Sequence, residues 1–415
     1  MKEFSKERID ALKAYIDTNL PGTIHTVDDQ KDIEYPVNYP YTSPCSGKKF
    51  RDFYYWDTYF ICLGLVHLQR WDLIYYNIKN CFDLIDRFGY VPNYNRYYGS
   101  NRSQPPFLVN LVDLYYKHSK DLNFLKDGVL HLEKELTFWY SDRGFANGLS
   151  HYGVQPTPDK ESIAFYEMIN KTRVKYPCET EEEKLIASKH FYAEAESGWD
   201  FNPRFNHHAL DYAAVDLNCN LYAYEVKLAE FFNILGMSDK ATTYLQKATQ
   251  RKELLDQYLW DSESGLFLDY NVKENHLSSC QSMASFFALY QGVATKEQAQ
   301  QTIAKLEEFL YPYGFTTCLP GTYPVAYQWD YPNGWPCLQI IGVRGLLRYG
   351  YIAEAHKAAT AFLSNILDNF EASGHLWEKY NVVEGTLNVS NEYELPIMLG
   401  WTAAAALDMM NVLGL

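Results

Sequence analysis

The stretch AHKAATAFLSNILDNF, residues 355–370, shows most clearly which secondary structure dominates this chain. Its apolar side chains recur every three or four positions, at Ala355, Ala359, Phe362, Ile366 and Phe370. This spacing places them on one face of an α-helix. The same spacing recurs at Leu125, Val129, Leu132 and Leu136. Strand-like alternation is scarce elsewhere, so we expect helices to build the fold.

Helix starts and loops fit the same interpretation. Thr295 and Gln298 have the spacing of a capping box, and Ser238 is expected to cap the helix that runs toward Trp260. Segments rich in Gly, Pro, Asn and Tyr separate the helices at 36–56, 88–106, 196–206, 318–336 and 376–394. No low-complexity linker divides the chain. We therefore predict one all-α domain over residues 1–415 whose loops carry the chemistry.

Composition narrows the class of protein. Hydrophobic residues make up 47% of the 415 residues, which is ample for a large core, and aromatic residues make up 16%. Aromatic side chains suit pockets that stack on the apolar faces of sugars. The formal net charge of -15 repels phosphate backbones and anionic lipids, and no Lys/Arg run offsets it. Nucleic acid and membranes are therefore not expected as partners.

The amino terminus and the cysteines predict a location. The first seven residues, MKEFSKE, are charged and lead into an amphipathic stretch without the apolar core of a signal peptide. The eight cysteines are scattered, with no Cys-x-x-Cys pair for zinc or redox chemistry. These features predict a reduced, cytoplasmic protein that needs no metal.

Two carboxylates stand beside tryptophans, far apart in the chain. Asp200 ends the segment ESGWD (196–200), and Glu378 lies in LWEKY (376–380). An aromatic neighbour can hold an acid against the face of a sugar ring, whereas a solvated charge is usually bordered by polar residues. Two such acids could act on opposite sides of a glycosidic bond.

Several motifs resemble those of the trehalases, in the order in which that family has them. The two longest are FRDFYYWDTY at 50–59 and QWDYPNGWP at 328–336, and the shorter ones are VPN at 91–93, RSQPP at 102–106, ESGWDF at 196–201 and EKY at 378–380. The resemblance implies an (α/α)6 barrel, or toroid, with its active site in the loops at one end. It also implies an inverting hydrolase of α-glucosides, most directly of α,α-trehalose to two glucose molecules, that uses no cofactor.

The resemblance assigns roles to individual residues. Asp200 matches the general acid and Glu378 the general base, while Glu392 matches an acid that helps to hold the attacking water. An inverting hydrolase keeps its two carboxyl groups roughly 6.5 to 9.5 Å apart so that water fits between them. Burial beside Trp199 would help to keep Asp200 protonated. The alternative for each acid is an ordinary helix cap or a salt bridge.

The other matched residues are expected to bind the sugar. They are Arg51, Trp56, Asp57, Asn93, Arg102, Gln104, Glu161, Trp329, Trp335 and Glu392. Arginine and amide side chains donate hydrogen bonds to hydroxyl groups, and Asp57 can accept them. Tryptophans in a helical protein also serve as core. Asp216 matches the family too, or serves as a helix cap.

Two departures from the family pattern concern the leaving group. Asp159 and Lys160 stand where trehalases usually have Arg-Pro, ahead of Glu161 and Ser162, and Asn388–Asn391 replaces a glycine-rich lid. Both segments are expected to border the leaving group. The sequence therefore predicts cleavage of an α-glucoside without fixing trehalose as the substrate.

Three alternatives remain open. A related (α/α)6 α-glycosidase acting on another glucosyl or mannosyl conjugate would keep both acids. A sugar epimerase would be expected to use paired histidines, but His207, His208 and His375 lie outside the matched motifs. A sugar-binding protein without activity would not need both acids. The oligomeric state is not predicted.

Overall fold

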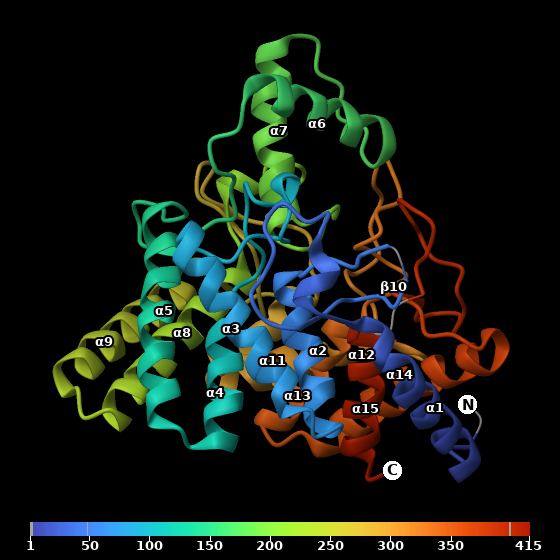
Figure 1. Cartoon of the computed structure of the whole chain (residues 1–415). Coiled ribbons are helices and arrows are strands. Elements are labelled where there is room, and N and C mark those ends of the chain that lie inside the picture. The colour runs from blue at the N-terminus through green and yellow to red at the C-terminus, as the bar shows by residue number, and fades with distance from the viewer. Residues whose placement is uncertain (1–2, 48, 398–399) are drawn as a thin grey trace.

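The structure is a computed structural model that describes residues 3–47, 49–397 and 400–415 (Figure 1). Among these residues, six helices form a closed inner ring. They are α2 (Tyr55–His67), α4 (Leu108–Ser119), α8 (Val215–Ile234), α10 (Phe286–Tyr290), α13 (Pro336–Arg348) and α15 (Gly400–Leu413). Consecutive members are in contact, and α15 packs against α2, so that the ring closes. At this closure a Cβ atom on Gly64 would lie 2.9 Å from the Ala404 Cα, which is why a glycine is needed there.

An outer layer of helices alternates with the inner ring along the chain. Its members are α1 (Lys6–Asn19), α3 (Trp71–Phe88), α5 (Leu122–Ser141), α9 (Ser238–Leu254), α11 (Lys296–Ala304) with α12 (Leu306–Phe309), and α14 (Ile352–Ser373). Inner and outer helices differ in sequence because they are buried to different extents. The inner helix α2 is apolar on nearly all sides, whereas the buried residues of the outer helix α9 form a single stripe. The predicted all-α (α/α)6 barrel is confirmed.

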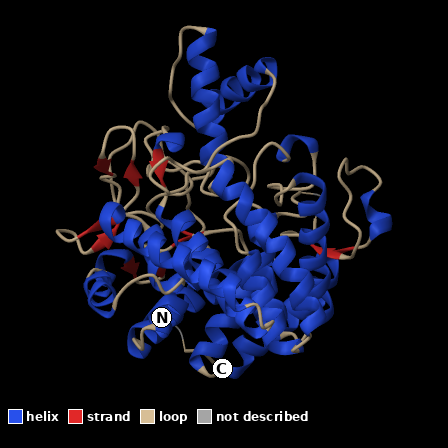
Figure 2. Cartoon of the chain, turned by 90° about the vertical axis from the view of Figure 1, so that its left-hand side faces the viewer, coloured by secondary structure: helices blue, strands red, loops and turns tan. Residues whose placement is uncertain are grey.

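Strands and short helices occupy the connections (Figure 2). The strands, each of two residues, are β1 (Ile24–His25), β2 (Tyr41–Thr42), β3 (Tyr212–Ala213), β4 (Trp260–Asp261), β5 (Leu266–Phe267), β6 (Tyr270–Asn271), β7 (His276–Leu277), β8 (Leu310–Tyr311), β9 (Gly314–Phe315), β10 (Asn333–Gly334) and β11 (Tyr380–Asn381). The short helices are η1 (Leu20–Thr23), η2 (Val27–Gln30), η3 (Tyr97–Gly99), η4 (Ala209–Asp211), η5 (Leu255–Leu259) and η6 (Met283–Ser285). The antiparallel pair of β10 and β11 joins the loop of the second long motif to the loop of Glu378.

Two further helices, α6 (Asp159–Thr172) and α7 (Glu181–Glu196), stand above the ring in Figure 1. They pack on each other through a separate aromatic cluster that includes Phe165, Tyr166 and Phe191. The C-terminal end of α7 leads directly into the ESGWD segment. This pair therefore positions one wall above the loop end of the ring.

Of the predictions about individual helices, the two apolar stripes and one capping box are confirmed, and one N-cap is wrong. The stripe at 355–370 lies in α14 and the stripe at 125–136 in α5, and their side chains are buried except that of Phe370, which is partly buried. The Thr295 capping box is present. The cap predicted at Ser238 is wrong, because Met237 is the N-cap and Ser238 is the first residue of α9. None of the described helices has the length and apolar character of a membrane span.

Candidate active site

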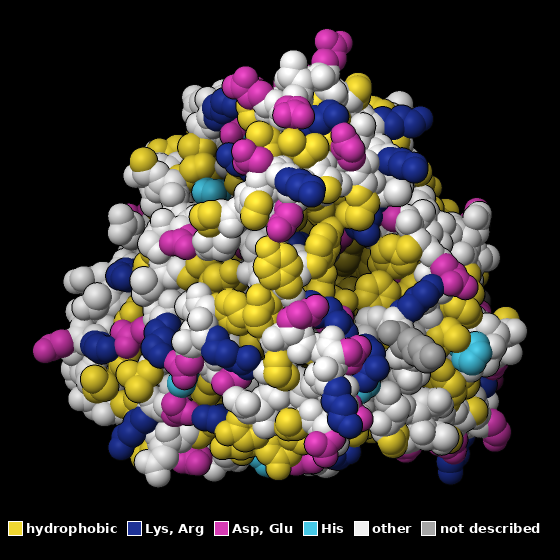
Figure 3. All heavy atoms as spheres, turned by 45° about the horizontal axis from the view of Figure 1, so that its top comes forward, with side chains coloured by type: hydrophobic (Ala, Val, Ile, Leu, Met, Phe, Trp, Pro, Cys, Tyr) yellow, Lys and Arg dark blue, Asp and Glu magenta, His cyan; other side chains and the backbone are white. Residues whose placement is uncertain are grey.

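A pocket of about 240 Å³ opens at the loop end of the ring, where Figure 3 shows a hollow bordered by apolar and aromatic side chains. The segments just before or at the starts of α2, α4, α13 and α15 meet there. The predicted site residues that line it are Trp56, Asp57, Asn93, Arg102, Gln104, Asp200, Trp329, Trp335 and Glu378. The motifs that are dispersed in the sequence thus converge on one cavity.

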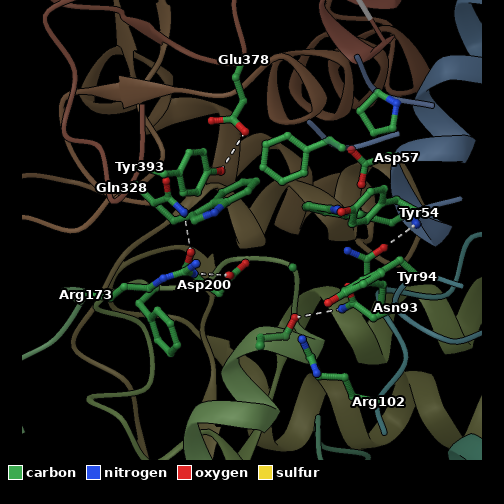
Figure 4. Close-up of a pocket in the computed structure, with 18 of the residues that line it drawn as sticks. Tyr54, Asp57, Asn93, Tyr94, Arg102, Arg173, Asp200, Gln328, Glu378 and Tyr393 are labelled. Atoms are coloured by element: carbon green, nitrogen blue, oxygen red, sulfur yellow. Dashed lines mark hydrogen bonds and ion pairs between the residues drawn. The ribbon is translucent and has the colours of Figure 1, made fainter. Parts of the chain in front are cut away.

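Asp200 and Glu378 approach this cavity from opposite sides (Figure 4). Asp200 follows the turn after α7, where Gly198 has φ +78° and lies against the Trp56 indole, so that an added Cβ would be 2.9 Å from that ring. Glu378 lies in the loop between α14 and β11. The arrangement allows one acid to act on each side of a bound sugar.

Asp200 has surroundings that raise its pKa. Its side chain is 34% exposed and borders the pocket, and Arg173 Nη1 lies 2.9 Å from Asp200 Oδ2. Loss of solvent raises the pKa of Asp200 to about 6, while the positive charges of Arg173 and Arg102 oppose this rise. Gln328 Nε2 also donates to the Asp200 carbonyl at 2.7 Å. A carboxyl with this pKa is suited to donate a proton near neutral pH.

Glu378 is held by two donors and is almost fully buried. The Tyr393 hydroxyl donates to Oε1 at 2.8 Å, and Lys379 Nζ donates to Oε2 at 2.7 Å. Burial raises the pKa of Tyr393 well above its usual value, so its hydroxyl keeps the proton that it donates. The two bonds fix the orientation of the Glu378 carboxylate.

Asp57, in the first turn of α2, is a buried acid on the floor of the pocket. Burial, with the charges of Glu378 and Asp200, raises its pKa to about 8. At neutral pH it is therefore largely protonated, and a carboxylic acid both donates and accepts hydrogen bonds.

Tryptophans form the inner wall. Trp329 and Trp335 stack in parallel with ring centroids 3.7 Å apart, and Trp329 also packs on Trp199 and Trp56. Trp56, Trp329 and Trp335 line the pocket and belong to the core as well. Trp401 adds a perpendicular ring that the sequence interpretation missed.

Three polar side chains on the wall are fixed by their neighbours. Asn93 Nδ2 donates to the Ser103 carbonyl at 3.0 Å, and Gln104 Oε1 accepts from the Trp56 amide at 3.1 Å. The Arg102 guanidinium donates to Asn101 Oδ1 at 2.8 Å. These contacts hold the side chains in place before a ligand arrives.

Arg51 and Glu161 lie outside the residues that line this pocket. Arg51 Nη2 donates to the Asp29 carbonyl at 3.0 Å, whereas Phe50 and Tyr54 in the same segment line the pocket. Glu161 is exposed and accepts a hydrogen bond from the Tyr97 hydroxyl at 3.1 Å. Glu161 belongs to the first turn of α6, and only later turns of that helix reach the pocket.

Glu392 lies behind the pocket on the side of Asp200. Its Oε2 is 3.2 Å from Arg173 Nε, and its Oε1 accepts from the Phe201 amide at 3.1 Å. Burial raises its pKa well above the usual value. Arg173 thus bridges Asp200 and Glu392.

Four further residues at the site were not singled out from the sequence: Arg173, Gln328, Lys379 and Tyr393. Gln328, Lys379 and Tyr393 lie within or next to matched motifs, and their proximity was the signal that could have revealed them. Arg173 follows the last residue of α6 in a polar stretch without a motif. Only the tertiary structure brings it to Asp200.

A buried ionic network lies behind Trp199. Arg204 Nη2 contacts Asp216 Oδ1 at 2.7 Å and Asp269 Oδ1 at 2.8 Å, and all three side chains are almost fully buried. The guanidinium also lies over the Trp199 ring, 4.4 Å from its centroid. Asp216 is therefore neither in the pocket nor a helix cap, since Ala214 is the N-cap of α8. The network supports the loop that carries Asp200.

Among the described residues, one group has the composition of a metal site: His190, His208 and Asp211, whose ligand atoms lie within 4.8 Å of one another. None of the three lines the pocket. The prediction that the reaction needs no metal remains a prediction.

This chain is similar to known trehalases over nearly its whole length. The family model described as Trehalase matches residues 6–414. The periplasmic trehalases of Salmonella paratyphi B and Escherichia coli O8 are each 30% identical, over 97% of this chain and 74% of theirs. The structure of neutral trehalase from Saccharomyces cerevisiae superposes with a TM-score of 0.76 at 28% identity, covering 90% of this chain and 73% of that one. The mannosylglycerate hydrolase of Thermus thermophilus shares the fold, with a TM-score of 0.67 at 17% identity over 96% of this chain and 99% of that one.

The predicted cytoplasmic location is wrong by the same comparison, because these curated relatives are named periplasmic trehalases. The prediction rested partly on the scattered positions of the cysteines and on the lack of a Cys-x-x-Cys pair. In the structure the cysteines are free and, except for Cys178, buried. Buried free cysteines behave as small apolar side chains, so their number says little about the redox compartment.

The same comparisons confirm the family that the motifs suggested. The matched model spans nearly the whole chain, the relatives are aligned over 97% of it, and the fold is that of a solved trehalase. The chain therefore belongs to the trehalase family of glycoside hydrolases.

Proposed function

We propose that this protein hydrolyses α,α-trehalose to two glucose molecules with inversion, with Asp200 as the general acid and Glu378 as the general base. The observation that carries the proposal is the position of these two acids, which face one pocket from opposite sides in a trehalase-family fold. Their contrasting surroundings suit one proton donor and one proton acceptor.

The acid step uses the groups around Asp200. Its proton passes to the glycosidic oxygen as the bond between that oxygen and the anomeric carbon breaks. Arg173, at 2.9 Å, stabilises the carboxylate that remains. Glu392 shares Arg173 and so holds the guanidinium in place.

The base step uses Glu378. Its carboxylate removes a proton from a water molecule, and the oxygen of that water attacks the anomeric carbon on the face opposite to the leaving group. Tyr393 and Lys379 keep the carboxylate aimed at the pocket. The glucose released from this attack is the β-anomer.

The polar wall is proposed to bind the hydroxyl groups. Arg102 lines the pocket as a donor, and Asp57 is able to donate as well as accept. We further propose that residues 1–415 form one domain, since one core cluster runs from Ile9 to Met410. The net charge of -15 supports the proposal that neither nucleic acid nor a membrane is a partner.

A second candidate is cleavage of another α-glucoside by the same two acids. Asp159 and Lys160, which replace the family's arginine and proline, are exposed and lie outside the pocket lining. An arginine donates in a bidentate fork that these side chains do not reproduce at that position. Because this departure lies at the start of α6, whose C-cap Arg173 contacts Asp200, we propose that the specificity of this enzyme differs on the leaving-group side.

A substrate panel followed by NMR tests both candidates. We expect turnover of trehalose, with one β-glucose and one α-glucose released per bond cleaved, and lower but measurable kcat/KM for kojibiose, nigerose or glucosylglycerate. Turnover of another glucoside without turnover of trehalose would favour the second candidate. If α-glucose alone appeared first, the inverting mechanism would be wrong.

The surroundings of Asp200 predict the pH dependence. A general acid works only while protonated, so kcat/KM should fall as the pH rises through the Asp200 pKa of about 6. Arg173 favours the charged form, and its removal in Arg173→Gln should move this alkaline limb upward by roughly one pH unit or more. Profiles of kcat/KM against pH for wild type and variant measure the shift.

Arg173→Lys is the matched control, because it keeps the positive charge and should hold the limb near its wild-type position. An alkaline limb that stays in place in Arg173→Gln would show that Asp200 is not the group that titrates.

A further inference from the structure

A second cavity of about 590 Å³ adjoins the active-site pocket. We call it the outer groove and define it by Tyr97, Tyr98, Asn101, Gln155, Phe165 and Tyr192. The two cavities share Tyr98, Phe165 and Met168 as lining residues. The pocket therefore has a neighbour more than large enough for a further sugar.

The outer groove lies on the side of the general acid. Helix α6 borders both cavities: Glu161, near its start, lines the groove, and Phe165 and Met168 line both. Arg173, just after the end of α6, lines the pocket and contacts Asp200. Because the general acid protonates the leaving-group oxygen, the leaving group is the part of the substrate that points toward α6 and the groove.

The lining has the chemistry of a carbohydrate site. Tyr97 and Tyr98 are 54% and 46% exposed, which leaves aromatic faces open to a ligand. Phe165 and Tyr192 stack at 3.8 Å, and Arg102 lies over the rings of both Tyr98 and Tyr192.

Polar groups are interleaved with these rings. The amides of Asn101 and Gln155 and the carboxylate of Glu161 border the same cavity. The rings can contact the C–H faces of a sugar, and the Glu161 carboxylate can accept hydrogen bonds from its hydroxyl groups. The amides of Asn101 and Gln155 donate to Thr157 and Asp142, which holds them at the border of the groove.

We propose that the outer groove binds a further hexose of the leaving group, so that the enzyme cleaves α-glucosides whose aglycone is longer than one sugar. The inference rests on the proposed function and extends it to a substrate class. It also gives a role to Glu161, which was predicted to bind sugar and lies in the groove instead of the pocket.

The test compares trehalose with a trisaccharide in which one glucose of trehalose carries an α-1,4-linked glucose. Cleavage of the 1,1 bond by water gives glucose and maltose in either binding mode, and inversion distinguishes the modes: maltose that leaves into the groove is released as the α-anomer, together with β-glucose. We expect the wild-type kcat/KM for the trisaccharide to equal or exceed that for trehalose. Tyr97→Ala should lower the trisaccharide value about tenfold, the effect of one lost aromatic contact, and leave the trehalose value within about twofold.

Tyr97→Phe is the matched control, because it removes the hydroxyl that bonds to Glu161 and keeps the ring. It should preserve most of the trisaccharide activity. The inference would be overturned if Tyr97→Ala left the ratio of the two kcat/KM values unchanged. It would also be overturned if the trisaccharide gave trehalose in place of maltose, or maltose that appeared first as the β-anomer.

Failure of the proposed function has a different signature. Wild-type enzyme that cleaves neither sugar contradicts trehalose hydrolysis. In that case calorimetric binding of the trisaccharide to wild type and Tyr97→Ala decides the inference: weaker binding to the variant supports it, and equal binding overturns it.

Discussion

Asp200→Asn and Glu378→Gln are each expected to lower kcat on trehalose by about 10²- to 10⁴-fold, because each removes one of the two proton transfers. Asparagine and glutamine keep the shape of the side chains, so the variants should retain the wild-type circular dichroism spectrum and melting temperature. Steady-state glucose release measures the effect. Near-normal turnover by either folded variant would remove that residue from the mechanism.

A substrate with an activated leaving group separates the two roles. Fluoride departs with little help from an acid, so Asp200→Asn should regain much of its rate on α-glucosyl fluoride. Glu378→Gln should not, since water still needs a base. Asp10→Asn, at an exposed position on α1, is the matched control for the substitution and should leave both rates unchanged. Equal recovery by the two site variants would contradict the assignment of acid and base.

Arg204→Met is expected to lower the free energy of unfolding by about 3 to 5 kcal/mol, because it leaves Asp216 and Asp269 buried without their shared partner. Denaturant titration followed by fluorescence measures this loss. Activity should fall too, since the guanidinium packs on Trp199 beside Asp200.

The matched control for that variant is Arg70→Met. Arg70 pairs with Asp72 at the surface, with both side chains well exposed, so its loss should cost under about 1 kcal/mol. Adding Asp216→Asn and Asp269→Asn to Arg204→Met should recover part of the stability. If Arg204→Met had the same free energy of unfolding as the wild type, the buried network would not stabilise the fold, and the prediction would be wrong.

The all-α class was predictable because its signals are local and repeated, whereas the (α/α)6 arrangement was implied by the resemblance of the motifs to a known family. The stripe at 355–370 and the apolar run of α2 follow directly from what an outer and an inner helix must bury. The cap at Ser238 failed because a hydroxyl near a helix start does not fix which residue takes the cap conformation, and here Met237 takes it.

The candidate site was predictable where motif and geometry coincide. Asp200 and Glu378 line the pocket, although the tryptophans directly beside them, Trp199 and Trp377, are not among its lining residues. Arg173 was not predictable, since its role depends on the direction in which α6 crosses the rim. Glu161 and Arg51 keep their places in the motifs, yet α6 and the loop of Phe50 turn their side chains away from the pocket.

The closed ring has a consequence for how the chain folds during synthesis. Its closing contact joins α2, near the start of the chain, to α15, near the end, with Gly64 against Ala404. Contacts between segments so distant in sequence form slowly, because the loop between them must first be ordered. Until α15 leaves the ribosome, the apolar side of α2 that it covers has no native partner. The contact surface between α2 and α15 is therefore where chaperone binding and aggregation compete with folding for the longest time.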